Sequence, residues 1–248
     1  HPANYNDKYY GEVTLTDALS KSMNTAAVRL TLETGLGNFI KKLRKFGITA
    51  DLNRDLSLAL GSAGISAIEL TAAYAGLMNE GQKVTPYGIK RILTKDGVVL
   101  YDRADHRHSQ ARIAKSRYVE RLNTMLNHAV TYGTGRAAQI NGVNVYGKTG
   151  TSQDTRDAWF IGFTDKITTA VWLGNDDNTP MDHVTGGSFP ARIWQDLMRR
   201  GLEDTSPAYA YQKEGQSGFS RLLSSILGGS DNTPTVTTTP KPSYDLNE

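Results

Sequence analysis

The chain has 248 residues, with a formal net charge of +3, 38% hydrophobic residues and 21% charged residues. This is the composition of an ordinary globular protein, and the charge is too small to indicate nucleic-acid binding. The chain has no cysteine, which excludes a disulfide framework and a thiolate metal site. No apolar run approaches the roughly 20 residues that a membrane-spanning helix needs.

The first part of the chain predicts mainly helices. Residues 1–10 show no periodicity and predict a loop. Thr14, with Asp17 three residues later, predicts the start of a short helix that breaks near Ser22–Asn24. Further helices are predicted over TAAVRLTLETGLG, ending at Gly35 or Gly37, over residues 39–46, and over SAIELTAAYAGLMNEG, with Gly81 as its stop.

The pattern changes after residue 81. KVTPYGIKRILT and GVVLYD alternate around a Lys-Asp-Gly turn and predict a hairpin, which a helix over residues 115–130 follows. NVYGKTG, DAWFIGFTD and ITTAVWLGND then predict three successive strands, and SFPARIWQDLMRRGL predicts a closing helix. This order predicts an α+β fold in which helices flank an antiparallel sheet beside an all-helical part.

The folded part is predicted to be one domain over residues 1–202. Residues 203–248 are rich in Ser, Thr, Pro and Gly. Such a segment buries too little apolar surface to offset its ordering entropy, so we expect a linker or disorder.

GVNVYGKT at residues 142–149 fits the phosphate-loop pattern G-x-x-x-x-G-K-[ST]. A phosphate loop places its lysine on the first turn of a helix, where backbone N–H groups face phosphate. Here the alternation before Lys148 predicts a strand, and the residues after Thr149 are weak helix formers. We therefore interpret the match as a coincidence.

The same residues suit a different chemistry. Lys148-Thr149-Gly150-Thr151 is a K-T-G-T run predicted on an edge strand, which can bind an extended acyl substrate through its main chain. The lysine supplies positive charge, the threonine hydroxyls can hold a carboxylate, and the glycine permits close approach. Ser22-Met23-Asn24 is an S-x-N between two helices. Either motif alone is weak, but in this order they match the second and third motifs of the serine acyltransferases that react with penicillin.

Longer segments carry a family resemblance. The chain is similar to the transpeptidase domain of class A, bifunctional penicillin-binding proteins over roughly residues 5–202. The resemblance implies a periplasmic D,D-transpeptidase that crosslinks peptidoglycan stem peptides through an acyl-enzyme and is a target of β-lactams, with no cofactor. The segments that carry it are ALSKSMNTAAVRL, LALGSAGISAIELTAAYAGLMNEG, YGTGRAA (132–138) and GKTGTSQDTRDAWFIGFTDKITTAVWLGNDD (147–177).

The resemblance also implies roles for individual residues. Ser22 resembles the hydroxyl that relays protons near the leaving group, and Asn24 the residue that hydrogen-bonds the substrate amide and the active-site lysine. Lys148 would supply electrostatic stabilisation and join the proton network. Thr149 and Thr151 would bind the substrate carboxylate, and the Thr151 N–H would form part of the oxyanion hole.

The first motif of the family, S-x-x-K, is not found in this sequence. No serine has a lysine three residues later, and the nearest relative is Thr238-Thr239-Pro240-Lys241 in the tail. The glycosyltransferase domain of class A is not found either. We therefore expect the chain to begin inside the transpeptidase domain, after its nucleophile. Alone it is expected to be inactive, and its expected partner is the N-terminal remainder of the same protein, without which apolar surface would be exposed.

Two other readings stay open. A non-catalytic binding module that recognises peptidoglycan peptide or a partner protein would also lack S-x-x-K. A serine β-lactamase has the same kinds of motif, but the long tail fits that class of enzyme poorly.

The run Asp105-His106-Arg107-His108 predicts an exposed loop, not a metal site.

Overall fold

The computed structural model describes residues 3–4, 8–105 and 111–204. Asp105 is thus described, whereas His106–His108 and the tail from residue 205 onwards lie outside these ranges. The elements in chain order are α1 (Leu15–Ser20), α2 (Asn24–Thr34), α3 (Leu36–Phe46), η2 (Leu56–Leu60), α4 (Ala67–Met78), β1 (Arg91–Leu93), β2 (Val99–Asp102), η3 (Arg103–Asp105), α5 (Ser116–Thr131), η4 (Arg136–Ala138), β3 (Tyr146–Thr151), η5 (Gln153–Thr155), β4 (Asp157–Phe163), β5 (Thr168–Gly174) and α6 (Phe189–Asp204).

An antiparallel sheet organises the second half of the chain. Its strands follow the order β3-β4-β5, so β4 is central and β3 is an edge strand, as the sequence predicted. Lys148 pairs with Ile161 in the register of β3 and β4. The α+β class and the antiparallel sheet flanked by helices are confirmed.

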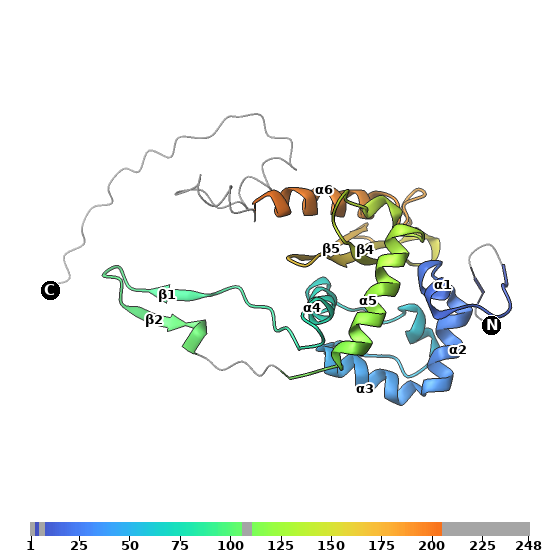
Figure 1. The fold of residues 1–248 in the computed structure, drawn as a ribbon, viewed down its shortest axis with the longest axis horizontal. Helices are drawn as coiled ribbons and strands as arrows, with labels where there is room; N and C mark the ends of the chain where they lie inside the picture. The colour runs from blue at the N-terminus through green and yellow to red at the C-terminus, as the bar shows by residue number, and fades with distance from the viewer. Residues whose placement is uncertain (1–2, 5–7, 106–110, 205–248) are drawn as a thin grey trace. The chain divides into compact units, whose positions relative to one another are not determined.

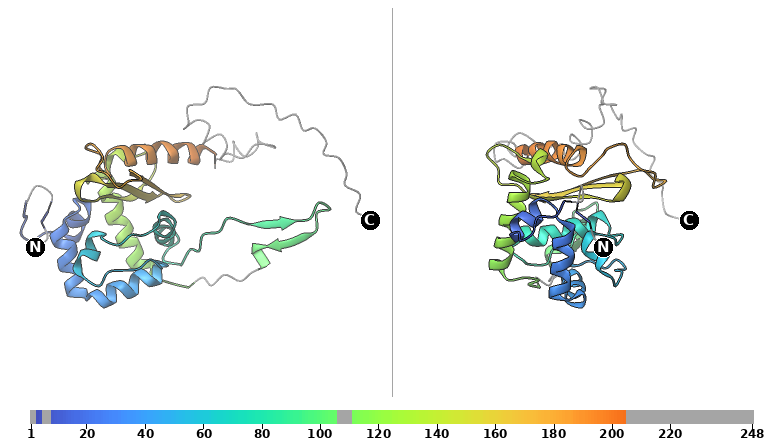
Figure 2. Two further views of the ribbon diagram at one scale, coloured as in Figure 1. Left: turned by 180° about the vertical axis from the view of Figure 1, so that it is seen from behind. Right: turned by 90° about the vertical axis from the view of Figure 1, so that its right-hand side faces the viewer.

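Helices cover both faces of this sheet (Figure 1 and Figure 2). On one face, Trp194 and Met198 of α6 pack against Phe160 of β4, with the Trp194 and Phe160 rings 5.1 Å apart and inclined at 63°. On the other face, Phe163 joins residues of α4 and α5. β4 is therefore buried on both sides and fixes the position of β3 beside it.

The helical part is set by local signals that the sequence predicted. Thr14 accepts a hydrogen bond from the Asp17 N–H and donates one to its carboxylate, which starts α1. α2 ends at Gly35, one of the two stops predicted for it. α4 ends earlier than predicted, at Met78, with Asn79 as its cap. A separate apolar cluster under α3 and η2 centres on Ile48, Leu52 and Leu58.

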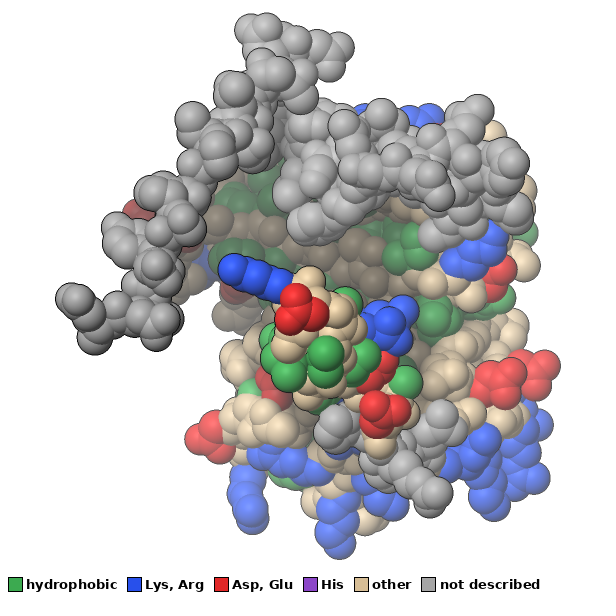
Figure 3. Space-filling model, turned by 90° about the vertical axis from the view of Figure 1, so that its left-hand side faces the viewer, with side chains coloured by type: hydrophobic (Ala, Val, Ile, Leu, Met, Phe, Trp, Pro, Cys, Tyr) green, Lys and Arg blue, Asp and Glu red, His purple; other side chains and the backbone are tan. Residues whose placement is uncertain are grey.

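The predicted hairpin of β1 and β2 forms but is shorter than its apolar pattern. Most of its side chains are exposed, unlike those of β4. Figure 3 views the molecule from the hairpin end, where apolar side chains show at the surface. Exposed apolar residues in and around the hairpin are Tyr87, Ile89, Ile92, Leu93, Val98, Val99 and Leu100.

Candidate active site

Ser22 lies in a tight turn between α1 and α2. The Ser22 N–H donates to the Leu19 carbonyl at 3.1 Å, and the Met23 N–H donates to the Ala18 carbonyl at 2.9 Å. This is a Schellman turn, whose left-handed position glycine usually occupies. Ser22 takes that position with φ of 54°. This conformation costs a residue other than glycine about 1–3 kcal/mol, so the turn holds a serine where glycine would be easier to accommodate.

Lys148 reaches this turn from β3. Its ammonium donates to Ser22 Oγ at 2.9 Å and to the Thr149 carbonyl at 3.0 Å, although Ser22 and Lys148 are separated by 126 positions in the sequence. Desolvation lowers the pKa of Lys148 to about 8. The lysine can therefore change its charge near neutral pH, as groups that take part in proton transfer do.

The phosphate-loop interpretation fails on the same geometry. Lys148 lies inside β3, and β4 follows after a single 3-10 turn, so no helix begins beneath the lysine. Its ammonium points toward a serine hydroxyl, and the cradle of backbone N–H groups that a phosphate loop needs is not formed by these residues.

The remaining K-T-G-T residues have partners that the sequence analysis did not assign. Thr149 Oγ1 lies 2.7 Å from Thr134 Oγ1, and Thr151 Oγ1 accepts from the Gly186 N–H at 3.0 Å. Thr134 also donates its N–H to the Ser20 carbonyl, so it links β3 to the end of α1. The YGTGRAA segment contributed to the family resemblance, but no residue in it was predicted to belong to the site. Gly186 was part of neither the resemblance nor the predicted site.

Two glycines are required where chain segments meet around this site. A Cβ on Gly186 would lie 2.2 Å from the Trp159 carbonyl oxygen and 2.4 Å from the Gly150 carbonyl oxygen. A Cβ on Gly133 would lie 2.3 Å from the Ser20 carbonyl oxygen. A side chain at Gly186 would force its loop away from β3 and β4, and one at Gly133 would force the segment after α5 away from the end of α1. Repeated small residues in YGTG and TGG were the available sequence signal.

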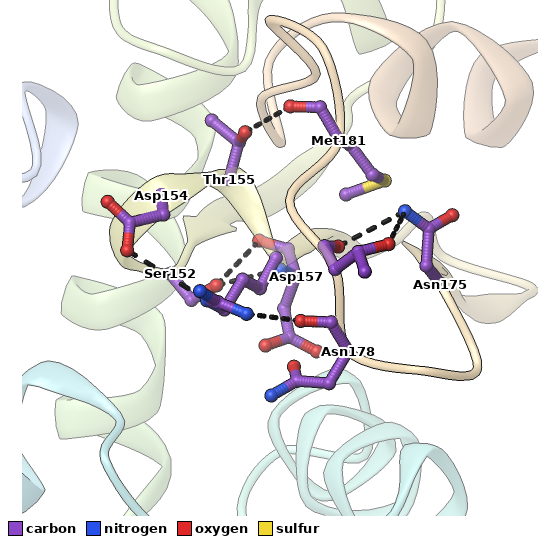
Figure 4. A network of polar contacts seen from close by, with 9 residues as sticks. Ser152, Asp154, Thr155, Asp157, Asn175, Asn178 and Met181 are labelled. Atoms are coloured by element: carbon purple, nitrogen blue, oxygen red, sulfur yellow. Dashed lines mark hydrogen bonds and ion pairs between the residues drawn. The ribbon is translucent and has the colours of Figure 1, made fainter.

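A polar network secures the loop that brings Gly186 to β3 (Figure 4). The Thr155 hydroxyl donates to the Met181 carbonyl at 2.5 Å, and the Thr155 carbonyl accepts from the Met181 N–H at 3.2 Å. Arg156 donates to the Asn178 carbonyl. Because these bonds join the turn after β3 to the segment before Gly186, the far end of the K-T-G-T run is held from outside the sheet.

Asn24 is the first residue of α2, two positions after Ser22. Its amide nitrogen donates to the Ala3 carbonyl at 2.9 Å. Asn4 also contacts this region, because its Oδ1 accepts from both the N–H and the hydroxyl of Thr25 at 3.0 Å. The sequence pattern of these first residues predicted a loop but gave no sign of their contact with the S-x-N motif.

Two kinds of feature are absent from the part of the chain that the structure describes. No helix in the described ranges is long and apolar enough to cross a membrane. Within the same ranges, no cluster of three or more His, Asp or Glu side chains could bind a metal ion. The Asp105–His108 run predicted as a loop lies outside the described residues from His106 to His108.

Comparisons with known proteins agree with the motifs. The family of the penicillin binding protein transpeptidase domain matches residues 2–199. The chain is 37% identical over 199 residues to penicillin-binding protein 1A of Aquifex aeolicus, a match covering 80% of this chain and 27% of that protein. It is 36% identical over 209 residues to penicillin-binding protein 2D of Bacillus subtilis, covering 82% and 30%. The chain thus spans less than a third of these relatives.

Solved structures show the same fold. Penicillin-binding protein 1A from Haemophilus influenzae matches with a TM-score of 0.75 and 26% identity, over 83% of this chain and 36% of that one. PonA1 of Mycobacterium tuberculosis in complex with penicillin V matches with a TM-score of 0.74 and 23% identity, over 82% and 60%. The chain belongs to the penicillin-binding protein transpeptidase family, and the resemblance to its class A members is confirmed.

Proposed function

We propose that this chain is the substrate-binding part of a serine D,D-transpeptidase that crosslinks peptidoglycan stem peptides and is acylated by β-lactams. The observation that carries the proposal is the contact between Lys148 and Ser22 at 2.9 Å, beside an edge strand. Edge strands bind extended peptides by adding a strand, which places the substrate next to this pair of side chains.

The contacts support a separate role for each side chain in the site. The protonated Lys148 uses one donor on Ser22 Oγ, so the Ser22 hydroxyl proton is left to point toward a leaving amine. Ser22 and Lys148 would thereby relay the proton that the nucleophile gives up. The Thr149 and Thr151 hydroxyls would hold the substrate carboxylate, and the Thr151 N–H would stabilise the oxyanion. Asn24 would hydrogen-bond the substrate amide.

The nucleophile, in this proposal, lies outside the 248 residues, on the N-terminal remainder of the same protein. No serine here has a lysine three residues later. The packing also leaves apolar surface uncovered among the described residues, because α4 is apolar on most of its circumference yet Ile68 is 60% exposed. A helix that is apolar all round is normally buried, so a further element would cover it.

The test is intact-mass spectrometry of the whole protein and of this chain alone after incubation with penicillin. The proposal expects a penicilloyl adduct on a segment preceding residue 1 in the whole protein and none on this chain. An adduct on this chain would show that a serine among these residues is the nucleophile. The absence of any adduct on the whole protein would reject the transpeptidase function.

We place the enzyme at the periplasmic face of the inner membrane, where its substrate is found.

A binding module that recognises peptidoglycan peptide without chemistry is the second candidate. The absence of S-x-x-K from the sequence favours it. It predicts saturable binding of a stem peptide by the whole protein together with no penicilloyl adduct, so the same experiment separates the two functions.

A further inference from the structure

Residues Ala3 and Asn4, here called the N-terminal strap, lie across the S-x-N motif. Asn4 is only 7% exposed, and its Oδ1 accepts two hydrogen bonds from Thr25. Its amide nitrogen donates to the Lys8 carbonyl at 2.8 Å. The Ala3 carbonyl accepts from the Asn24 amide at 2.9 Å. Two adjacent residues of the strap therefore bind two adjacent residues of α2.

The bonds from Asn4 replace a helix cap that α2 lacks. The N-cap residue is Met23, whose side chain makes no capping hydrogen bond. The first N–H groups of a helix need acceptors from outside it, and a side-chain oxygen usually supplies one. Here Asn4 supplies it to the Thr25 N–H from 21 positions away. The side chains of the S-x-N motif therefore do not have to cap α2.

The strap also fixes the orientation of the Asn24 amide. Because its nitrogen is engaged by the Ala3 carbonyl, its oxygen is the end left to accept a hydrogen bond. None of the described residues donates to that oxygen. Ser22, two residues earlier, lies in the left-handed turn that directly precedes the start of α2.

From these contacts we infer that Asn4 is a positioning residue, which acts through Thr25 and Asn24 to hold the S-x-N motif against Lys148. The inference rests on the proposed function for its effect on acylation, but the contact itself can be tested without activity.

The experiment uses the whole protein that carries this chain, with Asn4→Ala, Asn4→Asp and the control Asn38→Ala. Asn38 is also an asparagine that bonds a carbonyl near a helix start, but it is exposed and lies on α3. Hydrogen exchange of the segment containing residues 22–26 is measured first. We expect Asn4→Ala to speed exchange there about fivefold, as loss of a cap does, and Asn38→Ala to leave it unchanged.

The acylation rate with penicillin is measured next. Asn4→Ala should lower it on the order of tenfold, and Asn4→Asp should restore most of the loss, because its carboxylate still accepts from Thr25. In an Asn24→Ala background, Asn4→Ala should cost little more, since both changes act on one group.

Each outcome of the exchange and acylation measurements supports or overturns the positioning role of Asn4. Unchanged exchange in Asn4→Ala, or additive losses in the double variant, would overturn the positioning role. Faster exchange with an unchanged acylation rate would also overturn it and leave Asn4 as a structural cap. If the unaltered protein is not acylated, the proposed function fails, while the exchange result still shows whether the strap holds the motif.

Discussion

Ser22 and Lys148 meet at 2.9 Å, but the chain positions them in different ways. Lys148 stands on β3, which is fixed by its register with β4 and by helices on both faces of the sheet. Ser22 stands in a turn of a few residues, held by local hydrogen bonds in a conformation that serine rarely takes. One half of the site depends on the core, and the other on a strained local structure.

We expect the largest loss of stability when packing against β4, the strand that positions Lys148, is removed. Phe160 is 0% exposed and packs against Trp194 on the face opposite α4. We expect Phe160→Ala to lower the free energy of unfolding by about 3–5 kcal/mol, measured by denaturant unfolding. Phe189→Ala is the control, because Phe189 is 56% exposed and should cost little. Equal losses in the two variants would contradict a dependence of β3 on this core.

Removing the charge of Lys148 should separate chemistry from folding. We expect Lys148→Met to lower the acylation rate of the whole protein with penicillin by about 10²–10³-fold. Its unfolding temperature at pH 7 should not fall, because the folded pKa of Lys148 lies below its ordinary 10.5 and burial of the charge opposes folding below pH 8. A lower unfolding temperature with normal acylation would assign Lys148 a purely structural role.

The pH dependence of the acylation rate tests the charge of Lys148 without removing its side chain. With a pKa of about 8, Lys148 is protonated below that pH and neutral above it. If the ammonium stabilises the substrate carboxylate and oxyanion, the acylation rate should fall above pH 8, approaching tenfold per unit. Lys148→Arg keeps its charge throughout and should abolish this decline. A rate that rises above pH 8 would instead favour the neutral amine as a base.

The smallest expected effect concerns the strain at Ser22. Glycine adopts a φ of 54° without the penalty that serine and alanine carry, so Ser22→Gly should have a free energy of unfolding about 1 kcal/mol higher than Ser22→Ala, which loses the same contact with Lys148. It also removes the hydroxyl, so acylation should fall. Ser22→Ala, measured beside it by thermal unfolding, removes the hydroxyl and keeps the strain. Equal stability of the two variants would show that the turn stores no strain.

Both halves of the site could be predicted from the sequence, but the contacts that join them could not. K-T-G-T on an edge strand and S-x-N between two helices followed from alternation, periodicity and a helix break. Thr134, Gly186 and Asn4 were missed as site residues, because each acts on residues distant in sequence. The hairpin of β1 and β2 shows the opposite case: its pattern predicted strands correctly, but the pattern did not reveal that they lie exposed.

The main helices and strands, their order and the α+β class followed from local sequence patterns, because side-chain periodicity and capping residues act over a few positions. Tertiary structure alone decided that Lys148 reaches Ser22, that its pKa falls to about 8, and that Asn4 caps α2. These features depend on desolvation and on hydrogen bonds between segments brought together by a shared core. No local pattern records them, since the partners become neighbours only when the sheet and helices pack.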